Sequence, residues 1–284
     1  MDPLPVALAQ TAPLLGAVDA NVAELERVLE DARRAGAELV VFPELALTGY
    51  ALRDAVADVA LPRGERLEAI AALGRGLAFT AGFVEQGSDG AFYNAALVAV
   101  DGRVAAVHRK RHLPTYGLFD EGRFFKAGAS ATLVDARGWR LGVLVCEEAW
   151  YPRTVDEIAT TGGAEALLVL ANGPGRGVQG GTRWQSQDAW LDLVRYYART
   201  YSVPVLLVNR TGVEEGLFFG GCSALVDPGG RVAAEAPVFE PALLLGELSR
   251  AALRRARLRN HGRPLAPPQP DPTMFPPTAA HGFA

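Results

Sequence analysis

Short apolar runs alternate with amphipathic stretches along this chain, which is the pattern of a layered α/β protein. Strands are predicted at residues 5–10, 38–42, 77–84, 92–100, 103–108, 132–135, 140–145, 165–171, 204–209, 222–226, 231–235 and 243–248. Apolar residues at helical spacing predict a helix that begins at a cap on Asp19 or Asn21 and ends at Gly36. Further helices are predicted at residues 65–73, 154–160, 183–201 and 250–257.

Most of these strands are apolar on both faces and several are separated by helices, which favours parallel pairing under helical cover. The turns Asp101-Gly102 and Asp227–Gly230 instead favour antiparallel hairpins, so the predicted sheets are mixed. Residues 1–260 form the predicted folded domain, with a proline-rich tail at 261–284. The polar stretch 109–129 is predicted to be a long loop, and loops of this length in compact domains are usually functional or mobile.

Composition narrows the class of protein. The formal net charge of −4 argues against a nucleic-acid surface, and the basic run 254–259 is interpreted as a solvated helix face. Only two cysteines occur in 284 residues, which favours a reducing compartment. Neither a signal peptide nor a membrane span is evident, so a soluble, cytoplasmic protein is expected.

Three reactive groups stand just past predicted strands. Glu44 follows the strand at 38–42, Lys110 follows 103–108, and Cys146 follows 140–145. Taken separately, each has an ordinary explanation, because charges often end strands and free cysteines are often buried in cores. Taken together they supply a nucleophile, a base that takes its proton, and an ammonium that stabilises an oxyanion.

The segments around these groups, 42–50, 109–113 and 145–150, resemble the three signature segments of the nitrilase superfamily, the carbon–nitrogen hydrolases. The resemblance implies a four-layer αββα sandwich, a homodimer or higher homo-oligomer, and no cofactor. It also implies a Glu44–Lys110–Cys146 triad that hydrolyses a non-peptide carboxamide through a cysteine thioester and releases ammonia. Glu121 stands where the family keeps a second glutamate beside the lysine.

Residues 110–125 and 220–230 further resemble the glutaminase domains of glutamine-dependent NAD synthetases. This resemblance implies an aromatic-lined substrate pocket. The predicted substrate-binding residues are Tyr50, Tyr116, Glu147, Trp150 and Asn172. Two departures stand out: residues 171–174 read Ala-Asn-Gly-Pro where those glutaminases have Asn-Ala-Ser-Pro, and no synthetase domain is expected after residue 260. Arg176 is available to supply positive charge, and a separate ammonia-using synthetase is the implied partner for a glutaminase.

Other interpretations compete with this one. The Gly175–Gly180 pattern G-x-G-x-x-G, before a helix, is also found in dinucleotide-binding loops, so a nucleotide-binding or non-catalytic module is an alternative. His112 is a rival partner for Cys146 in a Cys–His hydrolase. The pair His108 and His112 lies at a strand end rather than on a helix, and a protein-bound metal is not expected. Cys222 is interpreted as a packing residue.

Overall fold

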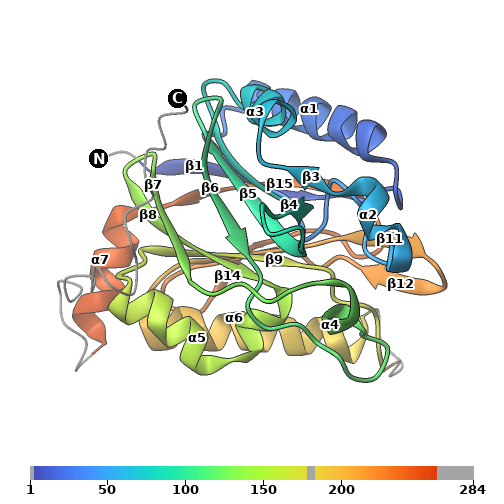
Figure 1. Cartoon of the computed structure of the whole chain (residues 1–284). Helices are drawn as coiled ribbons and strands as arrows, with labels where there is room; N and C mark the ends of the chain where they lie inside the picture. The colour runs from blue at the N-terminus through green and yellow to red at the C-terminus, as the bar shows by residue number, and fades with distance from the viewer. Residues whose placement is uncertain (1–2, 178–182, 261–284) are drawn as a thin grey trace.

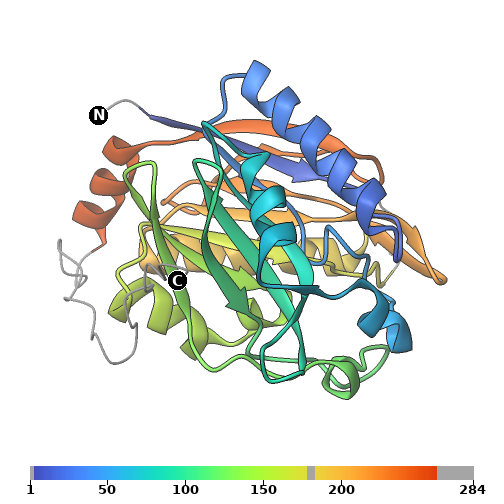
Figure 2. The same cartoon turned by 45° about the horizontal axis from the view of Figure 1, so that its top comes forward.

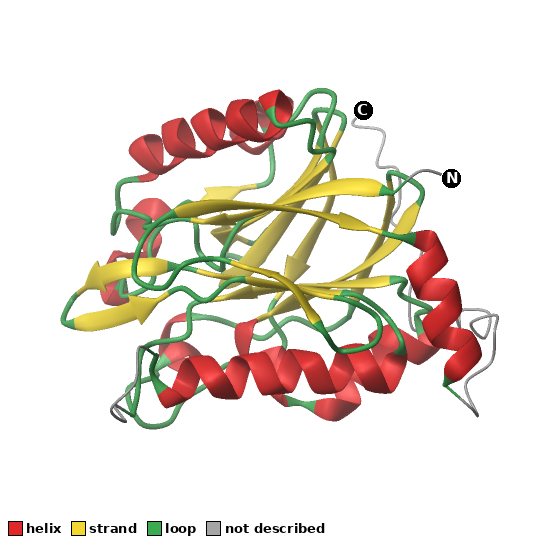
Figure 3. Ribbon diagram, turned by 180° about the vertical axis from the view of Figure 1, so that it is seen from behind, coloured by secondary structure: helices red, strands yellow, loops and turns green. Residues whose placement is uncertain are grey.

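The computed structural model describes residues 3–177 and 183–260, and these form two stacked β-sheets with helices on both outer faces (Figure 1). Helices α1 and α3 cover one sheet, and α5 and α6 cover the other (Figures 1 and 3). The layer order is therefore helix, sheet, sheet, helix, which confirms the predicted αββα sandwich. The predicted tail at 261–284 lies outside the described residues.

The first sheet has the strand order β15-β1-β2-β4-β5-β6, and β3 pairs with β4 beside this path. β1 pairs in parallel with β2, and β2 with β4, whereas the other neighbours along the path are antiparallel. The bounds are β1 Leu4–Gln10, β2 Leu39–Val41, β3 Leu61–Pro62, β4 Ala78–Gln86, β5 Phe92–Val100, β6 Arg103–Arg109 and β15 Ala242–Leu248.

The second sheet has the order β14-β13-β10-β9-β8-β7, with parallel pairing between β8, β9 and β10 and antiparallel pairing elsewhere. Both sheets are therefore mixed, as the sequence predicted. A separate hairpin is formed by β11 and β12. The bounds are β7 Thr132–Ala136, β8 Trp139–Val145, β9 Ala166–Ala171, β10 Val205–Asn209, β11 Thr211–Glu214, β12 Leu217–Gly220, β13 Ala224–Val226 and β14 Val232–Glu235.

The helices vary widely in length. Two long helices, α1 on the first sheet and α6 on the second, are visible on opposite sides of the sandwich (Figure 3). The α-helices are α1 Val18–Arg34, α2 Val56–Val59, α3 Glu65–Ala72, α4 Glu121–Phe124, α5 Pro152–Asp156, α6 Gln185–Tyr201 and α7 Arg250–Arg259. Single turns of other helix types are η1 Arg53–Ala55, η2 Cys146–Trp150 and η3 Glu157–Thr161. In the described residues no helix has the length and apolar character needed to cross a bilayer.

Two cores hold the layers together. The larger one lies between the sheets and continues under α5 and α6. It combines β1 and β2 side chains such as Leu8 with second-sheet side chains such as Leu168 and with Val194 of α6. The other lies under α1 and α3, where Leu25, Leu29 and Ile70 pack on the outer face of the first sheet (Figure 2). Each β-strand in the middle of a sheet is therefore covered on both faces, which explains its continuous apolar run.

The sequence-based prediction needs five corrections. The helix α2 was not predicted, because four residues are too few to show helical spacing. The α1 helix begins at Val18 without a side-chain cap, so neither Asp19 nor Asn21 caps it; Asn21 instead bonds Leu14 and the Leu47 carbonyl. The stretch 109–129 contains the short helix α4. The strand β3 and the β11–β12 hairpin were not predicted, because two and four residues are too short to show a periodic pattern.

Candidate active site

Glu44 is carried by a turn that crosses directly over β4. The Pro43 carbonyl accepts a bond from Gly82 N–H at 3.0 Å, and Leu47 N–H donates to the Gly82 carbonyl at 3.0 Å. A Cβ on Gly82 would lie 2.1 Å from the Leu45 nitrogen, so only glycine permits this approach. Leu45 has a φ of 45°, and this left-handed residue turns the chain sharply just after the glutamate. Glu44 ends fully buried.

Lys110 directly follows β6, and both of its backbone polar groups are hydrogen-bonded. Its N–H donates to the Asn94 carbonyl, and its carbonyl accepts from Gly128 N–H. The buried Nζ donates to Glu44 Oε1 at 2.7 Å and to both carboxylate oxygens of Glu121 at 2.8 Å. Burial alone would lower the pKa of Lys110, but the two carboxylates outweigh it and raise the pKa. The ammonium is therefore held charged between two glutamates.

The second glutamate, Glu121, opens α4 and is almost completely buried. Besides Lys110, it accepts a bond from the Tyr50 hydroxyl at 3.1 Å. Burial raises the pKa of Glu121 to about 7, and the neighbouring Glu44 adds to that rise. Asn94 on β5 donates to Glu44 Oε1 at 2.7 Å, so the same carboxylate oxygen accepts from two donors. The other oxygen, Oε2 of Glu44, is buried and has no hydrogen-bond partner.

Cys146 ends β8 with a φ of 47°, a conformation that costs about 1–2 kcal/mol for a residue with a Cβ. The bend starts the turn η2 and leaves the residue partly exposed. Burial of the thiol raises its pKa well above the usual value, and Glu44 raises it further, while Lys110 and the Asn172 N–H act in the opposite direction. Burial and Glu44 therefore favour the protonated form of the thiol, which lies within electrostatic range of Glu44, Lys110 and Glu121.

The two glutamates after the cysteine have different surroundings. Glu148 is fully buried and accepts bonds from His108 Nε2 at 2.7 Å, Val145 N–H at 2.7 Å and Arg111 N–H at 3.0 Å. It therefore ties the residue before Cys146 to the residue after Lys110. Glu147 accepts instead from the Tyr116 hydroxyl at 3.0 Å. Glu148 is thus the structural carboxylate of the pair, and Glu147 is the one that contacts a predicted pocket residue.

Asn172 and the aromatic residues complete the predicted site. Asn172 directly follows β9, is 1% exposed, and has no hydrogen-bond partner for either polar side-chain atom. Tyr116 is largely exposed and packs edge-on against Phe119, with ring centroids 5.6 Å apart. The Arg176 guanidinium lies over the Phe119 ring, 5.0 Å from the ring centre. Trp150 is 41% exposed and packs edge-on against Trp190.

The two histidines, the glycine pattern and the second cysteine are the residues on which the competing interpretations rest. The Nε2 of His112 bonds the Thr154 hydroxyl at 2.7 Å, and the ring stacks flat on Tyr151, with ring centroids 3.8 Å apart. The two histidines of the H-x-x-x-H pattern have separate partners, Thr154 for one and Glu148 for the other. The Gly175–Gly180 pattern lies partly outside the described residues. Cys222 is buried beside Leu191 and Ala224, and its thiol donates to Glu235 at 3.3 Å.

Fold and site together define a four-layer α/β protein with a buried glutamate–lysine cluster facing a strand-end cysteine. The sequence model of the family described as carbon-nitrogen hydrolase matches residues 5–258. The chain belongs to this family. It is 36% identical over 253 residues to the glutamine-dependent NAD(+) synthetase of Rhodobacter capsulatus, a match that covers 87% of this chain and 44% of the relative. The corresponding enzyme of Acinetobacter baylyi is 30% identical over 85% of this chain and 43% of its own length. The chain thus spans less than half the length of these curated relatives.

Solved structures show the same fold. The glutamine-dependent NAD+ synthetase of Acinetobacter baumannii aligns with a TM-score of 0.80 and 30% identity, over 89% of this chain and 47% of that one. A variant of the amidase from Nesterenkonia sp. AN1 aligns with a TM-score of 0.74 and 26% identity, over 92% of this chain and 97% of that one. In that structure the acetamide moiety of fluoroacetamide is added covalently at the active-site cysteine.

Proposed function

We propose that this protein is a cysteine amidohydrolase that cleaves a small non-peptide carboxamide and releases ammonia through a thioester on Cys146. The observation that carries the proposal is the buried cluster of Glu44, Lys110 and Glu121 in electrostatic range of that thiol. A second feature supports it: Glu44 has one oxygen bound to Lys110 and the other without a partner. That free oxygen is the available proton acceptor in the cluster.

The raised pKa of Cys146 defines the first step. Because burial and Glu44 favour the protonated thiol, a base must take its proton as the sulfur attacks the carboxamide carbon. Glu44 Oε2 accepts the proton, and Lys110 with the Glu147 N–H stabilises the negative oxygen that forms on the substrate. Glu44 then passes the proton to the amide nitrogen, the C–N bond breaks, and ammonia leaves a thioester on Cys146.

The second half uses the same base. Glu44 removes a proton from a water molecule as that water attacks the thioester carbon. The carbon–sulfur bond breaks, the sulfur takes the proton back, and the carboxylic acid product leaves. Glu121, which bonds Lys110 through both oxygens, acts as a positioning residue in this scheme.

The surroundings of Cys146 suggest how a substrate is held. Asn172 has a buried side chain with an unused donor and an unused acceptor, which match the two halves of a carboxamide. Tyr50, Tyr116 and Trp150 supply apolar ring surface, and Glu147 adds a carboxylate for a polar or positively charged group. The covalent acetamide adduct in the amidase from Nesterenkonia sp. AN1 supports nucleophilic attack by the corresponding cysteine in a similar fold.

The direct test is ammonia release from a panel of short carboxamides, ω-amides and glutamine. We expect wild type to release ammonia from at least one of them and Cys146→Ala to release none. In Glu44→Gln, deacylation should slow by about 10²–10⁴-fold, so the acyl adduct should accumulate on Cys146 and be visible by intact-protein mass spectrometry. Activity that survives in Cys146→Ala would remove the proposed nucleophile. Loss in His112→Ala with retention in Lys110→Ala would favour a Cys–His enzyme.

The relatives favour one particular carboxamide as a second candidate. The matched curated proteins are named glutamine-dependent NAD(+) synthetases, and this chain aligns with 43–44% of their length in the two cases above. In the second candidate function, the protein is a glutaminase that supplies ammonia to a separate synthetase. Arg176 on the Phe119 ring is available for the glutamine α-carboxylate. A glutaminase rate that rises on addition of a partner synthetase supports this candidate, and preference for short aliphatic amides over glutamine contradicts it.

A further inference from the structure

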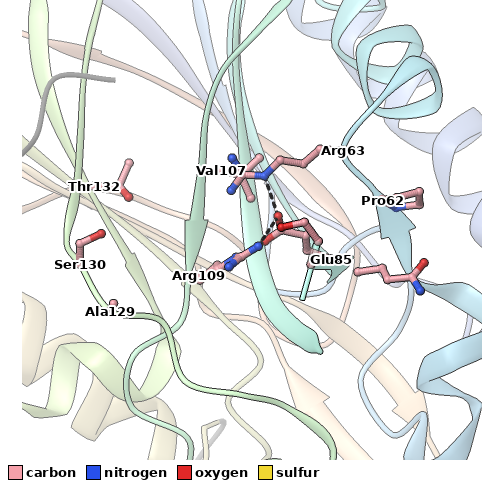
Figure 4. A pocket seen from close by; sticks show the side chains of 11 residues that line it. Pro62, Arg63, Glu85, Val107, Arg109, Ala129, Ser130 and Thr132 are labelled. Atoms are coloured by element: carbon pink, nitrogen blue, oxygen red, sulfur yellow. Dashed lines mark hydrogen bonds and ion pairs between the residues drawn. The ribbon is translucent and has the colours of Figure 1, made fainter. Parts of the chain in front are cut away.

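A cavity of about 470 Å³ lies on the edge of the first sheet, and none of its lining residues belongs to the cluster of Glu44, Lys110, Glu121 and Cys146 (Figure 4). Its walls come from the β3–α3 connection, the end of β4, the strand β6 and residues 129–132. The volume is within the range typical of small-molecule sites. The polar side chains around it are two guanidinium groups, one carboxylate, the amide of Gln86 and the hydroxyls of Ser88, Ser130 and Thr132.

Both guanidinium groups converge on one buried carboxylate. Glu85 is fully buried and accepts from Arg63 Nε at 2.6 Å, Arg109 Nε at 2.6 Å and Arg109 Nη2 at 3.0 Å (Figure 4). One negative charge therefore faces two positive charges, which leaves the charged lining with a surplus of +1. Because Glu85 uses both oxygens for these bonds, the remaining N–H groups of the arginines have to find other acceptors.

The two arginines differ in how firmly they are held. Arg109 makes a forked pair with Glu85, and its guanidinium lies 3.7 Å over the Tyr93 ring centre, so its position is fixed. Arg63 is half-exposed, and among the described residues its one ion-pair partner is Glu85, reached through Nε alone. Its two terminal nitrogens are therefore available at the cavity. A planar guanidinium with free terminal N–H groups matches the two oxygens of a carboxylate or phosphate.

We propose that this cavity binds a small oxyanion, a compound with a carboxylate or phosphate group, through Arg63 and Arg109. The surplus positive charge attracts the anion, the Arg63 fork recognises its oxygens, and the hydroxyls of Ser88 and Ser130 provide further donors on the cavity wall. The cavity is polar and only partly enclosed, which suits a small charged metabolite better than an apolar ligand. This site is independent of the amide chemistry proposed above.

The test is calorimetric titration of the full protein with inorganic phosphate and, separately, with malonate, against sodium chloride at equal ionic strength. We expect saturable binding of at least one anion with a dissociation constant of about 1 mM or tighter, and the tighter anion identifies the ligand class. Arg63→Gln should weaken that binding at least tenfold. Arg63→Lys keeps the positive charge but lacks the planar guanidinium, so its affinity for the anion should lie between those of wild type and Arg63→Gln.

The control variant is Arg66→Gln, which removes an equally exposed arginine that pairs with Asp19 outside the cavity. It should bind the anion as wild type does, and circular dichroism should show all variants folded. The proposal is overturned if neither anion binds more strongly than chloride. It is also overturned if Arg63→Gln and Arg66→Gln weaken binding equally, because the attraction would then be a general surface effect.

Discussion

Replacing Glu148 by glutamine should remove a large, pH-dependent part of the stability. Burial alone would raise the pKa of this carboxyl, but His108 and the N–H groups of Val145 and Arg111 together lower it from 4.5 to about 2. One pKa unit corresponds to about 1.4 kcal/mol, so the ionised carboxylate contributes about 3 kcal/mol to folding at neutral pH. A glutamine also presents an NH₂ group to one of these donors, which leaves a buried N–H unpaired.

The sign of the pH dependence follows from the lowered pKa. Because the folded-state pKa lies below the unfolded value, the stabilisation is fully present above pH 4.5 and is lost as pH falls toward 2. In wild type the contribution of Glu148 should shrink to about 1 kcal/mol at pH 3. Glu148→Gln has no carboxyl group at this position to protonate, so its free energy of unfolding should depend less on pH between pH 4.5 and pH 2.

The assay is urea unfolding of wild type and Glu148→Gln at pH 7 and at pH 3. We expect a difference of at least about 3 kcal/mol at pH 7 that is smaller by about 2 kcal/mol at pH 3, because the cost of the unpaired N–H does not change with pH. The matched control is Glu157→Gln, because Glu157 bonds the Arg111 side chain at 2.9 Å but keeps partial exposure. That variant should lose less than about 1 kcal/mol. Equal losses in the two variants, or a Glu148 effect that is the same at both pH values, would refute the reasoning.

Three shorter predictions concern the site itself. Gly82→Ala should lower the melting temperature and the ammonia-release rate together, because its Cβ would meet Leu45 N at 2.1 Å; unchanged melting would contradict the crossing geometry. Tyr50→Phe should move the pKa of Glu121 above about 7, since the lost hydroxyl bond favoured the charged form; an infrared titration of the carboxyl band in isotopically labelled protein measures it. Iodoacetamide should alkylate Cys146 slowly at pH 7 and faster with each increase in pH above 9, because the thiol pKa is raised. Peptide mass spectrometry measures the alkylation rate, and a rate that reaches its plateau below pH 8 would disprove the raised pKa.

Strand ends were the most informative signal in the sequence. Glu44, Lys110 and Cys146 each follow an apolar run, and each run proved to be a strand. The residues after two of these strands meet, with Lys110 Nζ 2.7 Å from Glu44 Oε1. Chain order alone did not show that Glu121, in a stretch predicted to be a loop, would open a helix and meet Lys110. That contact depends on how the loop folds back on the sheet, and periodicity carries no information on loop paths.

The different roles of the adjacent carboxylates Glu147 and Glu148 could not be predicted from the sequence. In a regular strand their side chains would point to opposite faces, but the left-handed bend at Cys146 cancels that rule. Their different roles are set by partners far away in the chain: His108 for Glu148 and Tyr116 for Glu147. The partner of each glutamate is determined by the tertiary structure, so no local sequence pattern could distinguish Glu147 from Glu148. The sequence likewise gave no signal that His108 would be buried as a partner for a carboxylate.

The groups proposed to react come from different sheets, and this has a consequence for how the site is stabilised. Glu44 and Lys110 follow strands of the first sheet, β2 and β6, while Cys146 and Asn172 follow strands of the second, β8 and β9. Two of these ends bend through a left-handed residue, Leu45 and Cys146, at a cost of about 1–2 kcal/mol each. Such bends persist only where neighbours enforce them, and here the backbone crossing at Gly82 enforces one and the Glu148 bonds enforce the other. If the packing between the sheets loosens, the electrostatic interaction between the Cys146 thiol and Glu44 should therefore be lost before either sheet unfolds.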